Sequence, residues 1–510
     1  MAKRKRDNAA KDGSSVDSPR KAIKATTAPE HQSSTAEPSA PVITLQIVTG
    51  SYERVLHGFT AGLSLSSEDN TDTSAGTPSV QFSDTFLFHA HASAVRSLAI
   101  SPLPEPDPSQ PQKVILASGG SDERINLYTL SVSPPLVNDK FPSVPTLAGN
   151  KILENPKNRE LGSLLHHSAN ISALYFPSRS KLLAGAEDNT ISVTKTRDWS
   201  VVSTIKAPRP KAQGRPSGDT APPGASPSGI NDFAVHPSMK LMLSVGKGER
   251  CMRLWNLVTG KKAGVLNFGK DILQSVKEGR WATGEGRRIV WNAEGEEFAV
   301  AFERGAVVFG TDSTPKCKLL PSPLTKLHDI SYVTVNQSKE GRDEVLAVST
   351  EDGRVIFYST KTTQKSKNED GEEQIPDAVV IAQFGGKPSG LSGRVKDFEI
   401  LELDGPGAFK DSLAVVTGGS DGAVRIWLVA KEDLKTRETE KSKKESKKDA
   451  PSPRQVGTLL GTYETGNRIT CLKAFVMRQF DDPSATDDSD FESEEEVEEA
   501  SSDESDGESE

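Results

Sequence analysis

Cysteine is scarce in this chain, and its spacing is uninformative for metal or disulfide chemistry. The three cysteines, Cys251, Cys317 and Cys471, lie far apart, and no C-x-x-C pair is present to hold zinc. Their odd number and wide separation also exclude the disulfide framework of a small secreted protein. We therefore expect a reduced, intracellular protein in which each cysteine is a small core residue.

Long apolar runs and the usual cofactor motifs are also lacking. No apolar segment is long enough to cross a bilayer, and the opening MAKRKRDNAAKDGSS has no apolar region of a secretory signal. No phosphate-cradling glycine loop, H-E-x-x-H motif or EF-hand loop occurs. We therefore expect no membrane association, no metal and no cofactor. Hydrophobic residues make up only 34% of the chain, so part of it is expected not to pack.

The net charge of −9 conceals three charged segments. Residues 481–510 hold 16 acidic residues and no basic one, and the rest of the chain has a formal charge of about +7. Most of this basic excess lies in residues 1–24 and 431–454. We predict a disordered basic arm over residues 1–40 and a disordered acidic tail over residues 479–510.

One short pattern recurs along the chain. Residues 415–427, VVTGGSDGAVRIW, contain the G-x-S-x-G pattern of a hydrolase nucleophile, with Ser420 at its centre. The same layout returns elsewhere as an apolar run, a small or hydroxyl residue, Gly, an acid, a β-branched residue and an aromatic one. The other copies, some of them decayed, are residues 114–128, 182–194, 243–255, 298–310 and 346–358.

The recurring pattern favours a structural repeat over a catalytic motif. Each copy is typical of a strand, a tight turn and a second strand, because apolar residues alternate around the Gly/Asp cluster. A further short strand is expected before each copy and another after it. Repeating units of four strands indicate a β-propeller, and the G…D…W layout is that of a WD40 repeat. The hydrolase alternative needs a helix after Ser420, whereas AVRIW predicts a strand.

Fragments at the two ends complete the predicted ring. Residues 467–476 resemble the first strand of a blade, and residues 47–59 resemble the second and third. We predict an all-β fold: a seven-bladed WD40 β-propeller over residues 41–478, closed by N- and C-terminal strands that share a blade. Its long, disordered insertions are expected near residues 60–81, 131–159, 207–229, 359–379 and 430–454.

The residues with chemical potential are interpreted as structural. His91 and Ser118 could join Asp122 in a buried hydrogen-bonded network; the alternative is a Ser-His-Asp catalytic triad. We favour the network and expect no enzyme activity. The predicted turn and network residues are His91, Ser118, Asp122, His167, Asp188, Asp352, Thr417, Asp421, Trp255 and Trp427.

The two terminal segments suggest targeting and regulation. A nuclear localisation signal is predicted from the basic residues Lys3, Arg4, Lys5, Arg6, Arg20, Lys21 and Lys24; the alternative is a merely solvated basic arm. Such an arm could also contact RNA phosphates electrostatically. Candidate phosphosites, each with an acid three residues later, are Ser489, Ser493, Ser501 and Ser505; the alternative is a solubilising tail.

The order of the motifs resembles the Mak/PAK-interacting WD40 family. The resemblance rests on GSYERVLHGF, HHS, GAED and LSVG followed by WNLVTG, and covers roughly residues 43–478. It implies a non-enzymatic scaffold in assembly and maturation of the 60S ribosomal subunit precursor in the nucleolus. The implied partners are ribosomal or ribosomal-like proteins and other pre-60S assembly factors, with the chain a monomer within a larger complex. The alternative implied by the family is negative regulation of p21-activated kinase by direct binding.

Overall fold

The structure, a computed structural model, describes most of the predicted propeller. The described residues are 43–66, 77–106, 112–135, 144–145, 151–209, 228–279, 282–338, 341–365, 374–391, 393–435 and 453–478. The predicted basic arm, the acidic tail and the central part of most predicted insertions lie outside these residues.

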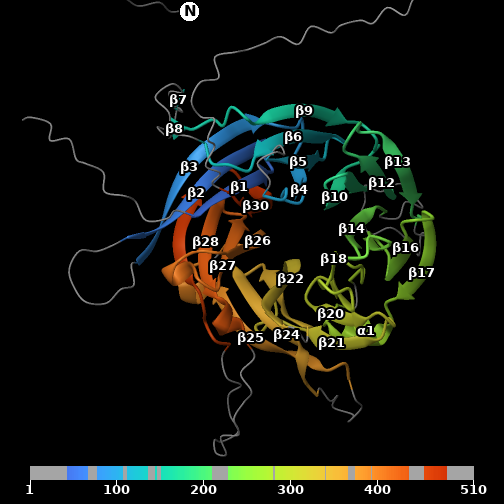
Figure 1. The fold of residues 1–510 in the computed structure, drawn as a ribbon. Coiled ribbons are helices and arrows are strands. Elements are labelled where there is room, and N and C mark those ends of the chain that lie inside the picture. Colours follow the sequence, from blue (N-terminus) through green and yellow to red (C-terminus); the bar gives the residue numbers. More distant parts are fainter. Residues whose placement is uncertain are drawn as a thin grey trace, which may run out of the picture. The chain divides into compact units, whose positions relative to one another are not determined.

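Within the described residues the fold is nearly all β, which confirms the predicted class (Figure 1). Four sheets have four strands each. They are β4 (Val95–Ile100), β5 (Lys113–Gly120), β6 (Ile125–Ser131) and β9 (Arg159–Leu164); β10 (Ile171–Ser178), β11 (Lys181–Ala186), β12 (Thr190–Lys195) and β13 (Val201–Lys206); β14 (Ile230–Val235), β15 (Leu241–Gly246), β16 (Cys251–Asn256) and β17 (Lys261–Asn267); and β26 (Val395–Leu403), β27 (Ser412–Gly419), β28 (Ala423–Ala430) and β29 (Thr458–Glu464).

A six-stranded sheet contains the first and the last described strands. Its order is β30-β1-β2-β3-β8-β7. Its strands are β1 (Ile43–Ser51), β2 (Val55–Ser66), β3 (Thr77–His89), β7 (Val144–Pro145), β8 (Lys151–Ile152) and β30 (Ile469–Val476). The strand β1 pairs antiparallel with β2 on one edge and with β30 on the other, so segments from both ends of the described chain share this sheet.

An eight-stranded sheet combines two antiparallel groups of four. The first group is β18 (Arg288–Trp291), β19 (Glu297–Ala301), β20 (Ala306–Gly310) and β21 (Pro315–Leu319). The second is β22 (Leu327–Ser338), β23 (Gly341–Thr350), β24 (Arg354–Gln364) and β25 (Asp377–Gly385). A single parallel pair, Lys318 with Asp377, joins the groups through β21 and β25.

The first strand of each four-stranded group and the edge strand β30 of the six-stranded sheet face a common centre (Figure 1). We call these the inner strands: β4, β10, β14, β18, β22, β26 and β30. Each inner strand contacts the inner strand of the next group in chain order, and β30 contacts both β26 and β4. The backbone register therefore brings equivalent positions of neighbouring inner strands close together.

Tight turns join the second and third strands of the groups, where the sequence places its Gly/Asp clusters. Gly353 and Gly422 adopt φ values of 83° and 87°, in the left-handed region that glycine tolerates best. A Cβ atom on Gly422 would also lie 2.9 Å from the carbonyl oxygen of Asn467. Asn189 takes the corresponding turn position with φ 65°, which asparagine accepts more readily than most residues.

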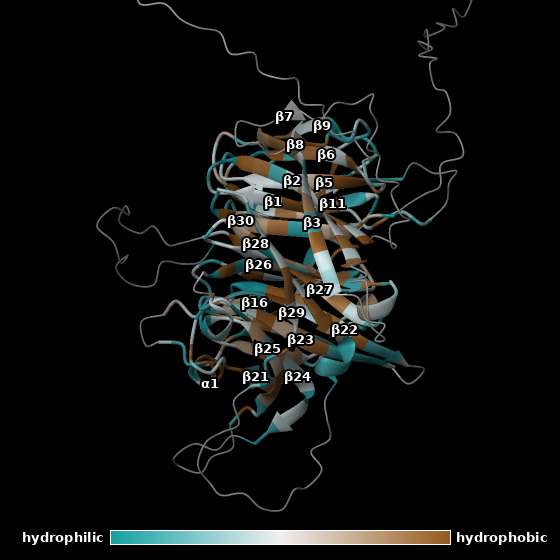
Figure 2. Cartoon of the chain, turned by 90° about the vertical axis from the view of Figure 1, so that its left-hand side faces the viewer, coloured by the Kyte–Doolittle hydropathy of each residue, from teal (hydrophilic) through white to brown (hydrophobic). Residues whose placement is uncertain are grey.

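The hydrophobic core lies between neighbouring groups of strands rather than at one centre. Figure 2 shows the hydrophobic colouring concentrated along the strands. One cluster joins Ile47 and Phe59 of the β1 sheet to Val416 and Ile426 of the β27–β28 hairpin. Equivalent clusters fill the other gaps between groups. Because burial of one large apolar side chain stabilises a fold by about 1.5–3 kcal/mol, these faces hold the groups together.

The structure corrects several boundaries expected from the sequence. Residues 60–66 and 77–81, expected in the insertion at 60–81, belong to β2 and β3. Their small and hydroxyl residues imitate a linker, but Leu63 is buried and Val80 and Phe82 pack against the same cluster as Ile47. The insertion at 359–379 is likewise shortened from both sides, by β24 and β25.

Two smaller expectations also change. A short helix, α1 (Lys270–Ser275), interrupts the all-β pattern, and three short 3-10 helices occur at Lys387–Ser389, Gly407–Phe409 and Lys431–Leu434. Of the cysteines, Cys317 and Cys471 are buried and free, as expected, whereas Cys251 is only half-buried. Cys251 begins β16 beside the polar Glu249, where the strand emerges from its turn.

The pairing of β1 makes its buried side chains essential for stability. Ile47 is 0% exposed, and Ile47→Ala is expected to lower the free energy of unfolding by about 2–5 kcal/mol through lost burial and the cavity left behind. The matched control is Val258→Ala, at a side chain 75% exposed, which should change it by less than about 0.5 kcal/mol. Chemical denaturation of both variants measures the difference; equal stability of the two would contradict the role of β1.

Candidate functional site

The structure brings His91, Ser118 and Asp122 together in one four-stranded sheet. His91 Nδ1 lies 2.9 Å from Asp122 Oδ1, and His91 Nε2 lies 2.8 Å from Ser118 Oγ. Asp122 also accepts the backbone N–H of Ala92 at 2.9 Å. The carboxylate fixes the proton on Nδ1, so Nε2 accepts the hydroxyl hydrogen of Ser118.

A second histidine makes a related set of contacts in the next sheet. His167 Nδ1 lies 3.2 Å from Asp188 Oδ2, while His167 Nε2 lies 2.8 Å from Ser192 Oγ. Burial opposes ionisation of Asp188, but hydrogen bonds from His167 and Thr190 outweigh it and lower its pKa to about 2. The hydroxyl that His167 contacts, Ser192 Oγ, comes from the third strand of its sheet, whereas Ser118 lies on the second strand of its own sheet.

Both arrangements have the order of a catalytic triad but lack access. Ser118 is 0% exposed, and its hydroxyl is held by His91 inside the sheet. Ser420 lies in the turn between β27 and β28, so a strand follows it instead of the helix that a nucleophile elbow needs. This geometry favours buried hydrogen-bonded networks over nucleophilic chemistry.

The remaining predicted turn residues are not joined to a histidine. Asp352 accepts hydrogen bonds from Thr350 Oγ1 at 2.5 Å and Arg354 Nε at 2.9 Å. Asp421 pairs with Arg425 at 2.7 Å, and Thr417 donates to the Arg425 carbonyl at 3.2 Å.

The two predicted tryptophans are buried at equivalent strand positions. Trp255 Nε1 donates to Ser244 Oγ at 2.8 Å, which satisfies its buried polar atom. The ring of Trp427 stacks on Phe384, with 4.8 Å between the ring centroids. The predicted localisation residues and phosphosites, by contrast, lie outside the described residues. They are Lys3, Arg4, Lys5, Arg6, Arg20, Lys21, Lys24, Ser489, Ser493, Ser501 and Ser505.

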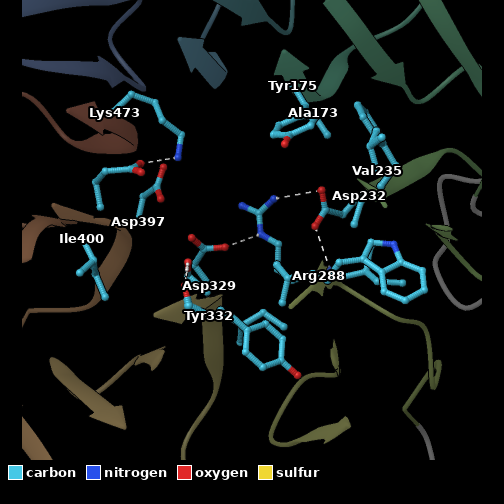
Figure 3. A pocket seen from close by; sticks show the side chains of 18 of the residues that line it. Ala173, Tyr175, Asp232, Val235, Arg288, Asp329, Tyr332, Asp397, Ile400 and Lys473 are labelled. Atoms are coloured by element: carbon cyan, nitrogen blue, oxygen red, sulfur yellow. Dashed lines mark hydrogen bonds and ion pairs between the residues drawn. The ribbon is translucent and has the colours of Figure 1, made fainter. Parts of the chain in front are cut away.

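A cavity of about 690 Å³ lies between the inner strands (Figure 3). Sequence reasoning missed its charged residues. One residue from each inner strand lines it at the position just before a buried apolar residue. These residues are Ser97, Ala173, Asp232, Arg288, Asp329, Asp397 and Cys471. Glu399 and Lys473 lie two residues further along β26 and β30.

Three of these side chains each accept a hydrogen bond from the backbone of the next inner strand. Ser97 Oγ accepts the backbone N–H of Leu174 at 3.1 Å. Asp232 Oδ2 accepts the N–H of Ile289 at 3.0 Å, and Asp397 Oδ2 accepts that of Leu472 at 2.8 Å. A side chain at the same register position thus accepts a backbone hydrogen bond from the next inner strand in three places. In the sequence each of these residues is visible only as a polar residue inside a short apolar strand.

Cations partly balance the carboxylates of the cavity. Figure 3 shows Arg288 reaching between two aspartates, with its Nε 3.3 Å from Asp329 Oδ1 and NH1 4.0 Å from Asp232 Oδ1. Lys473 Nζ lies 2.5 Å from Glu399 Oε2. Burial raises the pKa of Asp329 to about 8. Nearby Asp397 contributes to this rise, and the attraction of Arg288 opposes it.

Within the described residues, no group of three or more His, Cys, Asp or Glu side chains is arranged to hold a metal ion. Among the helices of those residues, none has the length and apolar character to span a membrane.

Comparison with known proteins gives a repeat match and then several relatives. A family model described as "WD domain, G-beta repeat" matches residues 158–194, which cover most of β9 to β12. The chain therefore contains a segment similar to a WD40 repeat. Its turns at Asp122, Asp352 and Asp421 are further copies of the pattern that the model matches once.

Relatives extend the similarity over most of the chain. The chain is 24% identical to a Xenopus laevis protein named "p21-activated protein kinase-interacting protein 1-like", over 85% of this chain and 82% of the relative. It is 26% identical to "Protein MAK11" of Saccharomyces cerevisiae, over 84% and 82%. It is 25% identical to "Shk1 kinase-binding protein 15" of Schizosaccharomyces pombe, over 64% and 71%. These matches confirm the similarity to the Mak/PAK-interacting WD40 family.

The raised pKa of Asp329 predicts a pH effect on stability. The unfolded chain loses this proton near its ordinary pKa of 3.8, whereas the folded protein loses it at about 8. The stabilisation from the bound proton is therefore complete below about pH 4 and is lost as the pH rises through about 8. Asp329→Asn cannot ionise, so its free energy of unfolding should decline less than that of the wild type between about pH 5 and pH 9.

Urea unfolding across this pH range measures the effect. The control is Asp312→Asn, at an exposed carboxylate whose pKa is lowered by hydrogen bonds from Thr314. A lowered pKa gives stability that is lost only as the pH falls, so this control should decline like the wild type. The same decline in Asp329→Asn would contradict the prediction.

Proposed function

We propose that this protein is a non-enzymatic WD40 scaffold in assembly and maturation of the 60S ribosomal subunit precursor. The observation that carries this proposal is the similarity to Protein MAK11 across 84% of the chain, together with the role implied by the family resemblance. In this proposal the networks around His91 and His167 hold their sheets in shape and perform no chemistry. The scaffold works by presenting surfaces to several partners at once.

The scaffold in this proposal is a closed ring of seven blades over residues 41–478. The antiparallel pairing of β1 with both β2 and β30 supports a blade shared by the two ends of the propeller. The contacts of β30 with β26 and β4 support closure, and the two halves of the eight-stranded sheet count as two blades. Closure removes open sheet edges, which suits a platform that must remain soluble beside other proteins.

The central cavity is the surface that we assign to a ribosomal or ribosomal-like protein. Its acids outnumber its cations even when Asp329, whose pKa is about 8, keeps its proton at neutral pH, and this balance suits a basic partner. The lining acids are Asp232, Asp329, Glu344, Asp397, Glu399 and Glu402. The lining bases are Arg96, Arg288 and Lys473.

The terminal segments complete the proposal. The basic residues from Lys3 to Lys24 act as the nuclear localisation signal, and the protein works in the nucleolus. The acidic tail from residue 479 attracts basic partners, and phosphorylation from Ser489 to Ser505 would add about −1.5 to −2 charges at each serine.

Depletion of the protein tests the ribosomal role. Free 60S subunits are expected to fall relative to 40S, and pre-rRNA processing is expected to stall, because a scaffold needed for assembly limits the particle it builds. Sucrose-gradient profiles and RNA blots measure both effects, and re-expression of the full chain should restore them. Purification of the tagged protein with mass spectrometry should recover pre-60S proteins. An unchanged gradient profile after near-complete depletion would sink the proposal.

The second candidate is a negative regulator of p21-activated kinase signalling that acts by direct binding. The names of the Xenopus and Schizosaccharomyces relatives, which refer to kinase interaction, favour it. Removal of residues 1–24 separates the two functions. A ribosome factor should leave the nucleus and fail to rescue depletion, whereas a cytosolic kinase regulator should keep its distribution and its effect on the kinase. Microscopy and kinase assays of the same cells measure both, with the double substitution Lys195→Gln/Lys240→Gln as a control for lost positive charge.

A further inference from the structure

The starts of the inner strands lie directly before the strand positions, such as Asp329 and Asp397, that line the acidic cavity. In six sheets the turn between the second and third strands donates a backbone N–H to the carbonyl of one residue just before the inner strand. The donor and acceptor pairs are Tyr52 to Arg468, Ser121 to Ala94, Glu187 to Asn170, Lys247 to Gly229, Glu351 to Lys326 and Ser420 to Arg394. These recurring bonds define equivalent positions at the start of each inner strand.

Basic residues lie at these positions, or within two residues of them, on four inner strands, although the acid Glu285 takes the equivalent position near β18. We call them the basic arc: Arg287, Lys326, Arg394, Lys396 and Arg468. They come from the starts of β18, β22, β26 and β30, which are consecutive neighbours. The corresponding positions at β4, β10 and β14 contain one base, Arg96, beside small or polar residues. The positive charge is therefore concentrated on one side.

Acidic residues neutralise only part of the arc. Glu303 pairs with Lys326 at 2.8 Å and with Arg287 at 3.7 Å, and Glu351 pairs with Arg394 at 3.1 Å.

The side chains of Lys396 and Arg468 make no ion pair within the described residues. Burial lowers the pKa of Lys396, and the neighbouring Arg394 and Arg468 lower it further. Burial, with nearby Lys396 and Arg394, lowers the pKa of His328 to about 4, so this imidazole stays neutral beside the cations. The arc therefore has a surplus of positive charge that a bound anion would relieve.

An exposed aromatic ring lies at the end of the arc. Tyr52 is 62% exposed, in the turn between β1 and β2. The Arg468 guanidinium lies 5.8 Å from the centre of the Tyr52 ring, and the backbone N–H of Tyr52 donates to the Arg468 carbonyl at 2.9 Å. A planar ring held beside a row of cations is the combination on which single-stranded nucleic acids stack.

We propose that the basic arc and Tyr52 bind single-stranded RNA, with Lys396 and Arg468 contacting phosphates and Tyr52 stacking on a base. The inference rests on the proposed function and deepens it, because it assigns the RNA-facing side of the scaffold. The acidic cavity then takes a basic protein while the strand starts beside it take RNA. An acidic protein segment would satisfy the cations but would leave the exposed ring of Tyr52 without a planar partner.

The test measures binding of fluorescein-labelled oligouridine, about 15 nucleotides long, to the full-length protein by anisotropy over a range of salt concentrations. The variant Lys396→Gln/Arg468→Gln should bind more weakly, and the slope of log affinity against log salt should fall by about 1.4, or about 0.7 for each phosphate contact. Tyr52→Ala should lose about 5- to 150-fold in affinity, the range expected for one stacked base.

The matched control is Lys195→Gln/Lys240→Gln, which removes the same charge from exposed lysines elsewhere and leaves the basic N-terminal segment intact. It should retain the wild-type salt slope. Lys396→Arg should bind RNA like the wild type, and thermal melts should show that all variants are folded.

Two results would overturn the inference. Arc variants that bind oligouridine with the control's affinity and slope would exclude an RNA site here. Loss of polyglutamate binding by the arc variants, without loss of RNA binding, would assign the arc to an acidic protein instead. In either case a depletion phenotype in 60S assembly would leave the proposed scaffold role standing, so the two failures are distinguishable.

Discussion

The unpaired edge of every inner strand is the constraint on which the rest of this molecule depends. Backbone N–H groups on such an edge face the centre and must find acceptors, because a buried unsatisfied donor costs about 1–3 kcal/mol. Asp232 and Asp397 supply these acceptors for the amides of the following strands, as Ser97 does with its hydroxyl. Asp232 and Asp397 thus line the cavity because they accept these backbone hydrogen bonds. The negative charge of the cavity follows from this structural role.

Neighbouring register positions on an inner strand differ in chemistry. Asp397 lines the cavity, while the residue directly before it, Lys396, belongs to the basic arc. A step of one residue along β26 therefore changes the side chain presented from a cation to a carboxylate. In the proposed arrangement this step separates the surface for a basic protein from the surface for RNA.

The sequence predicts the repeat well and the centre poorly. The turns around Asp122, Asp352 and Asp421 are visible because Gly and Asp punctuate apolar runs with a regular layout. The all-β class follows from that regularity alone. The extension of β2 and β3 into residues 60–66 and 77–81 is not visible, since Leu63 and Val80 are diluted by serine, threonine and glycine.

The cavity is hidden for a different reason. Asp232, Arg288 and Lys473 are far apart in the chain, and only the ring arrangement of inner strands brings them together. Each stands alone within a short apolar strand, where a single charged residue has many interpretations. The side-chain partners at His167 show the same limit, because the hydroxyl comes from Ser192 on a different strand from the one that Ser118 occupies.

The sheet that contains β1 has a consequence for how the protein is made. Beside the β1–β30 pairing the Thr470 hydroxyl donates to the Gly50 carbonyl, 420 positions away, so β1 reaches its final partner only after nearly all of the propeller has been translated. At ordinary elongation rates this delay is about 20–80 s. During that time an apolar strand edge stands open on the ribosome, and the nascent chain is a natural client for a chaperone that shields it until the last strand emerges.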